Sequence, residues 1–223
     1  MQHYASPRKV ADRTEYILQC CKGRRVLHLG AADHPYTKMR LENGTWLHAR
    51  ITQVASECLG VELDPSIVQQ LKTQHGISNI VVGDAENLSA DKHGRWDVVV
   101  AGEIIEHLNA PGHMMRSAAN VLTERGALVI TTTNAYCLRR CIRLVTGKES
   151  IHPDHVSFYS HRTLASLANR YGFTPIERLN YRMENRSAHL AWFVERVASA
   201  VVPAWGEGII HHYIASPLRK QCE

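Results

Sequence analysis

Trp96-Asp-Val-Val-Val-Ala-Gly-Glu-Ile-Ile-Glu-His-Leu108 is the stretch that decides the fold of this chain. Its valines form a β-branched run of the kind expected in a parallel strand that is buried on both faces. Glu103, Glu106 and His107 follow this strand, and in open α/β sheets ligands bind beyond the carboxyl ends of the strands. If a helical turn begins near Glu103, positions i, i+3 and i+4 project from one face. The stretch therefore predicts an active site at which three side chains share a small cation or a bound substrate.

The order of apolar segments along the chain predicts a Rossmann-like α/β fold. Short apolar runs alternate with segments that carry apolar residues at helical spacing, which indicates βαβ units. We expect a doubly wound sheet of about seven strands, mostly parallel with an antiparallel last strand. The expected strands are 26–29, 58–62, 80–82, 97–101, 127–132, 175–181 and 209–215. The expected helices are 10–20, 66–73, 113–122, 163–171 and 187–201.

Length and composition are those of an ordinary globular protein. The 223 residues suit a single domain, 1–223, with an N-terminal helix region at 1–22 and a substrate-side loop region at 133–160. Hydrophobic residues make up 44% of the chain and charged residues 21%, which argues against disorder. The formal net charge of +5 mildly favours anionic partners without marking a dedicated nucleic-acid binder.

Cysteines and apolar segments lead us to expect a cytoplasmic protein. The six cysteines show no C-x-x-C pair and no spacing typical of a zinc site or a secreted disulfide framework, so reduced thiols are expected. The N-terminus is polar, and the most apolar late segment, 189–202, is interrupted by Glu195 and Arg196. We therefore expect neither secretion nor a membrane span.

Three expected strand ends carry residues that suit a nucleoside cofactor. Gly30 follows the first strand, where backbone without a Cβ can approach a ligand closely. Glu62 ends the second strand, where a carboxylate can accept both ribose hydroxyls of an adenosine. Asp84 follows the third and can accept from an adenine amino group, with a Gly83-Asp84 turn as the alternative. Asp64, which precedes a proline, is expected to cap the next helix instead.

With these motifs in this order, the chain resembles the class I S-adenosylmethionine-dependent methyltransferases over roughly residues 8–215. In that family the first strand ends in an acidic residue and a glycine-rich loop follows. Here His28 stands in place of the acid, and Gly30 is the glycine that the loop keeps. The resemblance implies S-adenosylmethionine as the cofactor. It also implies a set of cofactor-binding residues, namely His28, Gly30, Ala31, Ala32, Glu62, Leu63, Asp84 and Ala85.

Within that class, the chain resembles the ubiquinone-biosynthesis O-methyltransferase group in Gly102–Leu108, Val129–Asn134, His155–Ser160 and Tyr171–Phe173. In some of those enzymes the Glu-x-x-Glu-His element is associated with a divalent metal. Small-RNA 3′-end 2′-O-methyltransferases combine such an element with a later Asp-His-x-x-Phe, which Asp154-His155-Val-Ser-Phe matches here. Downstream, Tyr159-Ser-His-Arg is closer to the small-molecule group. These resemblances imply a metal site made of Glu103, Glu106, His107 and His155.

The chemistry of these side chains leaves two roles open. Two carboxylates and two imidazoles can hold Mg, Mn or Zn, and such an ion lowers the pKa of an acceptor hydroxyl. Without a metal, Glu106 is a helix-start carboxylate and His107 a hydrogen-bonded histidine. In that case His107 or His155 is the candidate catalytic base, because imidazole titrates near neutral pH.

Two further groups of residues bear on partners. The basic cluster can grip a phosphate or a nucleic-acid backbone, or it can be a solvated helix face; it comprises Arg139, Arg140, Arg143 and Lys148. The late helix is expected to cover the sheet or a dimer contact through Trp192, Phe193 and Val197. We therefore expect a small-molecule acceptor with anionic groups, nucleic acid as the less favoured partner, and either a monomer or a homodimer.

The leading prediction is an O-methyltransferase that acts on a hydroxyl of a small metabolite or a sugar. One alternative is an RNA 3′-terminal 2′-O-methyltransferase that uses the same four ligands. Another is a binding protein that has kept the fold without the activity. A nicotinamide dehydrogenase is disfavoured, because Gly30-Ala-Ala-Asp-His34 lacks the G-x-G-x-x-G that a pyrophosphate requires.

Overall fold

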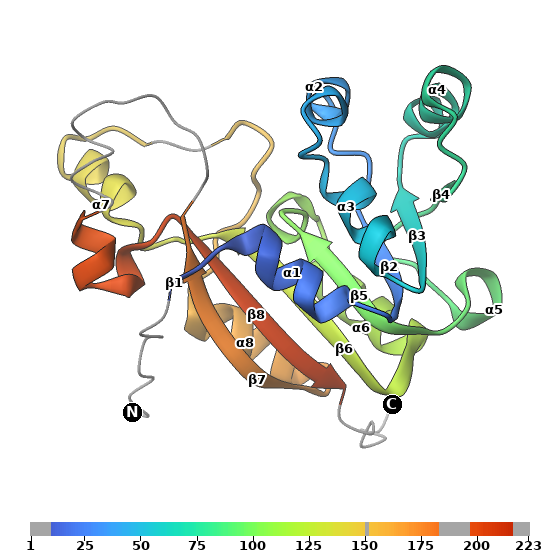
Figure 1. Cartoon of the computed structure of the whole chain (residues 1–223). Coiled ribbons are helices and arrows are strands. Elements are labelled where there is room, and N and C mark those ends of the chain that lie inside the picture. The colour runs from blue at the N-terminus through green and yellow to red at the C-terminus, as the bar shows by residue number, and fades with distance from the viewer. Residues whose placement is uncertain (1–9, 150–151, 183–196, 216–223) are drawn as a thin grey trace.

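The computed structural model describes residues 10–149, 152–182 and 197–215, and an open sheet of eight strands lies at its centre (Figure 1). The strand order is β1-β7-β8-β6-β5-β2-β3-β4. Neighbouring strands are parallel, except that β8 runs antiparallel to both β6 and β7. The strands are β1 (Val10–Ala11), β2 (Arg25–Leu29), β3 (Glu57–Glu62), β4 (Ile80–Val82), β5 (Trp96–Gly102), β6 (Leu122–Thr133), β7 (Phe173–Tyr181) and β8 (Gly208–Ala215). The predicted Rossmann-like sheet and its seven strands are confirmed, and β1 is added at one edge.

The predicted N-terminal helix begins later than expected. Val10 and Ala11 form the short edge strand β1 beside β7 instead of a first helical turn. Asp12 then caps α1 (Arg13–Cys21), because its side chain accepts a hydrogen bond of 2.8 Å from the Glu15 amide. A polar cap, and not the apolar pattern, therefore sets the start of this helix.

Helices lie on both faces of the sheet. Besides α1 they are α2 (Thr37–Glu42), α3 (Leu47–Val54), α4 (Pro65–His75), α5 (Ala90–His93), α6 (Pro111–Val121), α7 (Leu138–Val145) and α8 (His161–Arg170), with 3₁₀ turns η1 (Ile105–His107) and η2 (Pro203–Trp205). The predicted helices at 66–73, 113–122 and 163–171 are confirmed as α4, α6 and α8. Most of the predicted helix at 187–201, including Trp192 and Phe193, lies outside the described residues. Its described part, 197–201, is helical.

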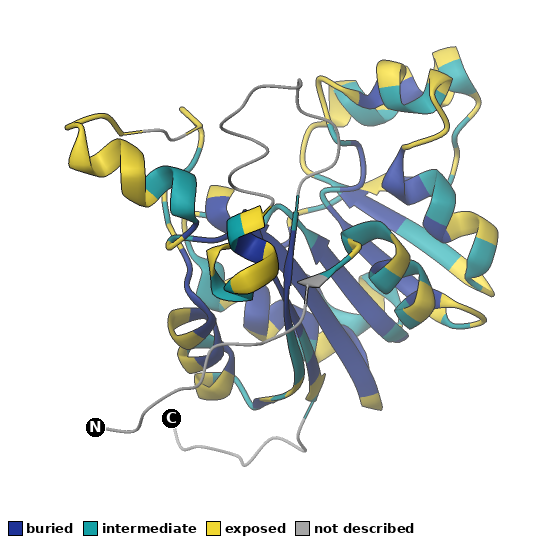
Figure 2. Cartoon of the chain, turned by 60° about the vertical axis from the view of Figure 1, so that its left-hand side comes forward, coloured by how far each residue is buried: buried dark blue, intermediate teal, exposed yellow. Residues whose placement is uncertain are grey.

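Alternation along the central strands creates two apolar layers, visible as the dark blue centre of Figure 2. Val98 and Val100 of β5 face the layer that contains Ile17 of α1 and Ile51 of α3. The opposite layer joins Val99 to side chains of α6 and α8, among them Met114, Met115, Ala118, Leu164 and Ala168. The three valines are fully buried, and each such side chain contributes roughly 1.5–3 kcal/mol. The β-branched run therefore forms the middle of the core, as its composition predicts.

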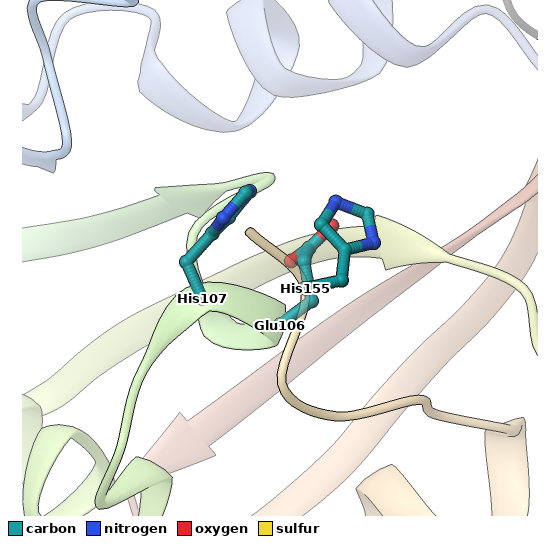
Figure 3. Close-up of side chains that lie close together, drawn as sticks. All are labelled: Glu106, His107 and His155. Carbon is teal, nitrogen blue, oxygen red and sulfur yellow. The ribbon is translucent and has the colours of Figure 1, made fainter. Parts of the chain in front are cut away.

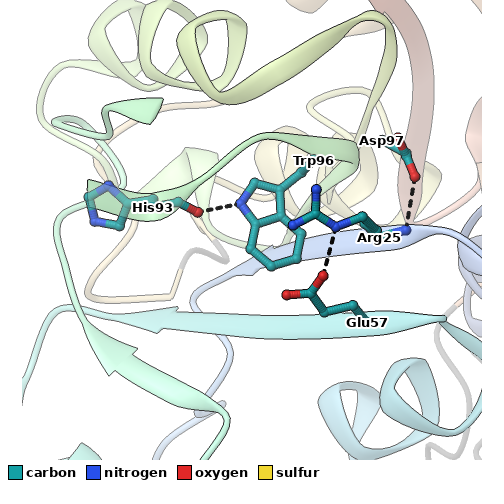
Figure 4. A network of polar contacts seen from close by, with 5 residues as sticks. All are labelled: Arg25, Glu57, His93, Trp96 and Asp97. Atoms are coloured by element: carbon teal, nitrogen blue, oxygen red, sulfur yellow. Dashed lines mark hydrogen bonds and ion pairs between the residues drawn. The ribbon is translucent and has the colours of Figure 1, made fainter. Parts of the chain in front are cut away.

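At the amino ends of the central strands a polar network fixes their register (Figure 4). The Arg25 amide donates to Asp97 at 3.1 Å, and the Arg25 guanidinium donates to Glu57 at 2.6 Å. The same guanidinium lies 5.1 Å from the centre of the Trp96 ring, whose indole N–H donates to the His93 carbonyl at 2.6 Å. These contacts join the starts of β2, β3 and β5 at the amino ends of the strands, whereas the predicted site lies at their carboxyl ends.

The strand order creates a switch point for ligand binding at the carboxyl ends of the central strands. After β2 the chain adds β3 and β4 on one side, and it then returns to add β5 and β6 on the other. Ligands in open α/β sheets bind at such a switch point, outside the carboxyl ends of the strands. One predicted residue stands at the carboxyl end of each of these four strands: Gly30 after β2, Glu62 at the end of β3, Asp84 after β4 and Glu103 after β5. The topology therefore brings the predicted residues to the same end of the sheet.

Two observations concern the state of the cysteines and the presence of membrane-spanning helices. The cysteines of the described part, Cys20, Cys21, Cys58, Cys137 and Cys141, are all free. Throughout residues 10–149, 152–182 and 197–215, no helix combines the length and the apolar character needed to cross a membrane.

Candidate active site

The loop after β2 is tightly folded around Gly30. Gly30 has φ of +66°, and a Cβ at this position would lie 3.1 Å from the Ile104 side chain, so both the conformation and the space favour glycine. Ala31 and Ala32 have no exposed surface. The amides of Gly30 and Ala31 both donate to the Val61 carbonyl, at 2.9 Å and 3.2 Å. The loop is therefore fastened to the end of β3.

The ends of β3 and β4 present two carboxylates. Glu62 accepts hydrogen bonds from the amide of Leu63 at 2.9 Å and from that of Asp64 at 3.4 Å, and Leu63 is 68% exposed. Asp84 accepts from the Glu86 amide at 2.8 Å, which confirms the turn geometry weighed as its alternative. Glu62 is half-buried and Asp84 is exposed, so both carboxylates remain accessible at the carboxyl ends of these strands, as cofactor binding requires.

Two smaller expectations at these strand ends are settled. Asp64 caps α4, because it accepts a hydrogen bond of 2.7 Å from the Ser66 amide, and hydrogen bonds from Ser66 lower the pKa of the Asp64 carboxyl. Ala85 is 7% exposed and belongs to the core beneath the turn, so its side chain faces the core and not the crevice.

His28 lies below the loop and not at the open edge. It is 3% exposed, and its Nδ1 lies 3.3 Å from Nδ1 of His48 on α3, with the two rings stacked at 5.5 Å. Burial, and then the charge of His48, hold the pKa of His28 well below its ordinary range. A neutral imidazole pair thus occupies the place where the resemblance puts an acid.

Glu103 departs from the predicted helical face. It has φ of +58°, a left-handed conformation that costs a non-glycine residue about 1 kcal/mol or more, and the 3₁₀ turn η1 begins only at Ile105. Its carboxylate accepts a hydrogen bond from the buried hydroxyl of Tyr181. Burial, and then the nearby negative charge of Glu103, raise the pKa of Tyr181, so this hydroxyl stays a donor. The prediction of one helical face from Glu103 to His107 was wrong.

Three of the four implied metal ligands gather at the carboxyl ends of β5 and β6 (Figure 3). One ligand atom from each of Glu106, His107 and His155 lies within 4.8 Å of the others. Glu106 and His107 come from η1, and the loop that carries His155 is held there because the Val156 amide donates to the Glu106 carbonyl at 2.9 Å. In the described part of the chain, this group does not include Glu103.

Two buried polar atoms of this three-residue group have no hydrogen-bond partner among the described residues. Glu106 has no exposed surface, and one carboxylate oxygen accepts a hydrogen bond of 3.4 Å from the Thr133 amide. Among the described residues, neither its other oxygen nor Nδ1 of His155 has a hydrogen-bond partner. Each such buried atom costs roughly 1–3 kcal/mol when nothing satisfies it. Burial, and then the charge of Glu103, raise the pKa of Glu106, so its ionised carboxylate is disfavoured unless a positive charge lies beside it.

The tautomer of His107 follows from its partner. Nδ1 of His107 lies 3.1 Å from the Asp154 carbonyl oxygen, which can only accept. Nδ1 therefore carries the proton, and the lone pair is on Nε2. A backbone carbonyl that holds the second ring nitrogen in this way is the usual arrangement around metal-binding histidines.

The sequence interpretation did not single out four other residues near the site. Trp46 and Tyr181 are buried behind the loop and behind Glu103. Arg13 donates to Thr131 at 2.9 Å and lies 5.9 Å from the Tyr181 ring centre. The ring of His152 lies 5.4 Å from that of His155. A tryptophan before a helix and a tyrosine at a strand end are common core residues, so no local pattern marks them.

The basic cluster is only partly a solvated face. Arg139 pairs with Glu207 at 3.2 Å, and Arg140 donates to the Asn134 carbonyl at 2.7 Å. Arg140 also lies 5.6 Å from the ring centre of Phe158, close to the three-residue group. Arg143 is exposed on α7, a helix without a buried residue (Figure 2). The cluster therefore divides between structural pairing and an exposed helix.

Comparisons with known proteins agree with this geometry. A family model described as a methyltransferase domain matches residues 1–178. The ubiquinone biosynthesis O-methyltransferase of Xanthomonas oryzae pv. oryzae is 26% identical over 117 residues, which are 50% of this chain and 44% of that protein. The ubiquinone biosynthesis O-methyltransferase of Caulobacter sp. is 38% identical over 50 residues, which are 22% of this chain and 20% of that protein. The chain thus spans less than half the length of these curated relatives.

Solved structures show the same fold at low sequence identity. A SAM-dependent methyltransferase from Archaeoglobus fulgidus is 17% identical with a TM-score of 0.57, and the match covers 91% of each chain. The N-methyltransferase NodS from Bradyrhizobium japonicum, solved with S-adenosyl-L-homocysteine, is 13% identical with a TM-score of 0.55, covering 92% of this chain and 86% of that one. Since the family model spans most of the chain, this protein belongs to the methyltransferase domain family.

Proposed function

We propose that the chain transfers the methyl group of S-adenosylmethionine to a hydroxyl oxygen of a small molecule, and that Glu106, His107 and His155 hold a divalent metal at the acceptor site. The observation that carries the proposal is the pair of buried, unpartnered ligand atoms on Glu106 and His155. Support for oxygen as the acceptor comes from the ubiquinone biosynthesis O-methyltransferases among the relatives.

The donor set fits a divalent ion of intermediate softness. Two imidazoles and one carboxylate suit Zn, Mn or Fe better than Mg, which prefers oxygen ligands. Three protein ligands also leave positions open for an acceptor oxygen. In this proposal Glu103 is not a ligand, because its carboxylate is turned to Tyr181.

The residues of the chain contribute mainly by orientation. In the proposed arrangement Gly30, Glu62 and Asp84 hold the cofactor across β2, β3 and β4, so that its methyl group faces the carboxyl end of β5. The bond to the acceptor oxygen forms as the bond from methyl to sulfur breaks, and the hydroxyl proton is released to solvent, so the products are S-adenosylhomocysteine, a methyl ether and a proton. Alignment of these atoms supplies much of the acceleration. A divalent ion, when bound, supplies the Lewis acidity that lowers the pKa of the acceptor hydroxyl.

An acceptor with an anionic group fits the surroundings of His155. The guanidinium of Arg140 lies over Phe158 close by, and its positive charge contributes to the lowered pKa of His155, after burial and the neighbouring histidines. A guanidinium in this position can bind a carboxylate or a phosphate. A small-molecule acceptor with an anionic group would therefore use residues that already lie at the proposed site.

Metal titration followed by a methyl-transfer assay tests the proposal. Calorimetry with Mn²⁺, Zn²⁺ and Mg²⁺ compares the wild type with Glu106→Gln and, as a matched control, Glu103→Gln. We expect one ion per chain, tighter for Mn²⁺ or Zn²⁺ than for Mg²⁺, and at least a tenfold loss in Glu106→Gln only. Methyl transfer from labelled S-adenosylmethionine to phenolic and sugar acceptors follows, with and without EDTA.

Two results would contradict the proposal separately. A wild-type protein that binds none of the three ions has no metal site of this kind. Methyl transfer to nitrogen or carbon of every accepted compound, identified by mass spectrometry of the product, would exclude the O-methyltransferase assignment and leave the metal site intact. Tighter binding of RNA than of small acceptors, with a steep salt dependence, would favour the RNA-directed alternative.

A further inference from the structure

The cofactor loop of this chain lacks the glycines that usually give such a loop its shape. After Gly30 come two alanines, and Asp33 adopts φ of +57°, which is unfavourable for a residue with a side chain. Contacts from outside the loop must therefore supply the stability that glycine would have given.

Three such contacts come from the segment that follows the loop. The indole N–H of Trp46 donates to the Ala31 carbonyl at 3.0 Å. The Thr37 hydroxyl donates to the Ala32 carbonyl at 2.5 Å. Arg40 forms an ion pair with Asp33 at 2.8 Å. Together they fix consecutive loop residues from the side of α2 and α3.

Trp46 is the most deeply buried of these three partners. It is 2% exposed and packs in one apolar cluster with Ala31, Ala32, Leu71 of α4 and Ile80 of β4. Its ring lies 5.4 Å from that of His48, the partner of His28 beneath the loop. The indole therefore contacts the loop with its apolar ring and with its single donor at once.

We propose that Trp46 is a cofactor-positioning residue, which replaces the missing glycines by holding the Ala31 carbonyl and so the shape of the loop at Gly30. The proposal rests on the placement of the cofactor over Gly30. It does not involve the metal site, and the two can be tested independently. Trp46 itself needs no contact with the cofactor, because it acts through the backbone of the loop.

The chain provides a matched control in a second buried tryptophan. Trp96 is also 2% exposed, and its indole N–H also donates to a carbonyl, that of His93, at 2.6 Å. It is the first residue of β5, so it lies at the amino end of this strand, whereas the cofactor loop follows the carboxyl end of β2. Figure 4 shows Trp96 beside Arg25 and His93. Trp46→Phe and Trp96→Phe each remove one indole N–H and its hydrogen bond. The first removes a hydrogen bond to the cofactor loop, and the second removes one that is remote from it.

Calorimetric titration with S-adenosylhomocysteine, alongside thermal unfolding, measures both effects. We expect both variants to melt at lower temperature than the wild type. Trp46→Phe should raise the Kd for S-adenosylhomocysteine about 3–10-fold, the range expected for the loss of one neutral hydrogen bond. Trp96→Phe should leave that Kd within about twofold of the wild type, since its hydrogen bond is remote from the loop.

Equal Kd values for the two variants would overturn the proposal, because the effect of Trp46 would then be general destabilisation. A wild-type protein that does not bind S-adenosylhomocysteine would overturn the cofactor site and this proposal with it. Thr37→Val serves as a second variant if Trp46→Phe does not fold. It removes the hydrogen bond to the neighbouring Ala32 carbonyl and should raise the Kd in the same direction.

Discussion

A buried chain of hydrogen bonds between α8 and the last two strands should make the stability of this protein depend on pH. His161 Nε2 lies 3.0 Å from the Asn180 side-chain oxygen, His161 Nδ1 lies 2.8 Å from His211 Nε2, and His211 Nδ1 lies 2.6 Å from the Tyr213 hydroxyl. The Asn180 oxygen can only accept, so each imidazole donates once and accepts once. Both histidines must be neutral for the chain to be complete.

Electrostatics keep them neutral in the folded protein. Burial lowers the pKa of His161 from 6.5 to about 4; the hydrogen bond that His161 donates to Asn180 partly compensates, and Arg178 lowers the pKa further. Burial, and then the charge of His161, also lower the pKa of His211 well below its ordinary range. In the unfolded chain both histidines regain ordinary values, so the unfolded state binds more protons below pH 6.5. Stability is therefore complete above that pH and is lost as the pH falls toward 4.

The size of the effect for His161 follows from these two pKa values. Linkage gives a loss of about 2 kcal/mol between pH 7.5 and pH 5, with a slope of about 1.2 kcal/mol per pH unit near pH 5.5. His161→Gln removes this titration and keeps a donor for Asn180, but leaves the His211 N–H unpaired. We expect the variant to be about 1–3 kcal/mol less stable at pH 7.5 and to show a shallower slope. The two stability curves should therefore converge near pH 5.

Urea unfolding followed by tryptophan fluorescence at pH 5, 5.5, 6.5 and 7.5 measures both curves. His113→Gln is the control, because His113 is exposed on α6 and its loss should leave the slope unchanged. Curves for wild type and His161→Gln that stay parallel over this range would refute the reasoning. In that case the acid sensitivity would have to come from other buried histidines, of which His28 and His48 have the strongest shifts near the cofactor loop.

Three further substitutions separate ligand binding from stability. Glu62→Gln should raise the Kd for S-adenosylhomocysteine at least tenfold with little change in melting temperature, and an unchanged Kd in calorimetry would remove Glu62 from the cofactor site. Asp64→Ala removes the cap of α4 and should lower the melting temperature by a few degrees while that Kd stays constant, which differential scanning calorimetry and the same titration check together. Glu57→Gln breaks an exposed ion pair with Arg25, so urea unfolding should show a loss below about 1 kcal/mol that disappears in 1 M salt, and a larger or salt-independent loss would contradict this.

The sheet was predictable because its strands carry local signals. The run at Val98–Val100 is β-branched, and strand ends are marked by Gly30 and by carboxylates such as Glu62. The edge strand β1 has only two residues, and its pairing with β7 depends on the tertiary fold, so no pattern of its own marks it. The helices α2 and α3 were missed for a related reason. Tyr36 and Trp46 stand at their N-caps without a side-chain cap, so the usual start signals are absent.

The candidate site was predictable in membership but not in geometry. Glu106 and His155 were identified, the latter through the resemblance, and they meet although 49 positions separate them in sequence. The left-handed conformation of Glu103 was not visible, because a glutamate after a glycine predicts no positive φ. With this conformation the Glu103 carboxylate contacts Tyr181, and among the described residues only three of the four predicted ligands lie together. Backbone conformation at a strand end therefore decided what residue spacing alone could not.

The two roles that the sequence left open for His107, metal ligand and catalytic base, compete for the same lone pair. The hydrogen bond from Nδ1 to the Asp154 carbonyl places that lone pair on Nε2. If Nε2 binds an ion it cannot accept a proton, so a metal in the site excludes His107 as the base. The same competition applies to His155, whose Nδ1 has no hydrogen-bond partner in the described part of the chain and lies beside the buried Glu106, because one lone pair can take either a cation or a proton.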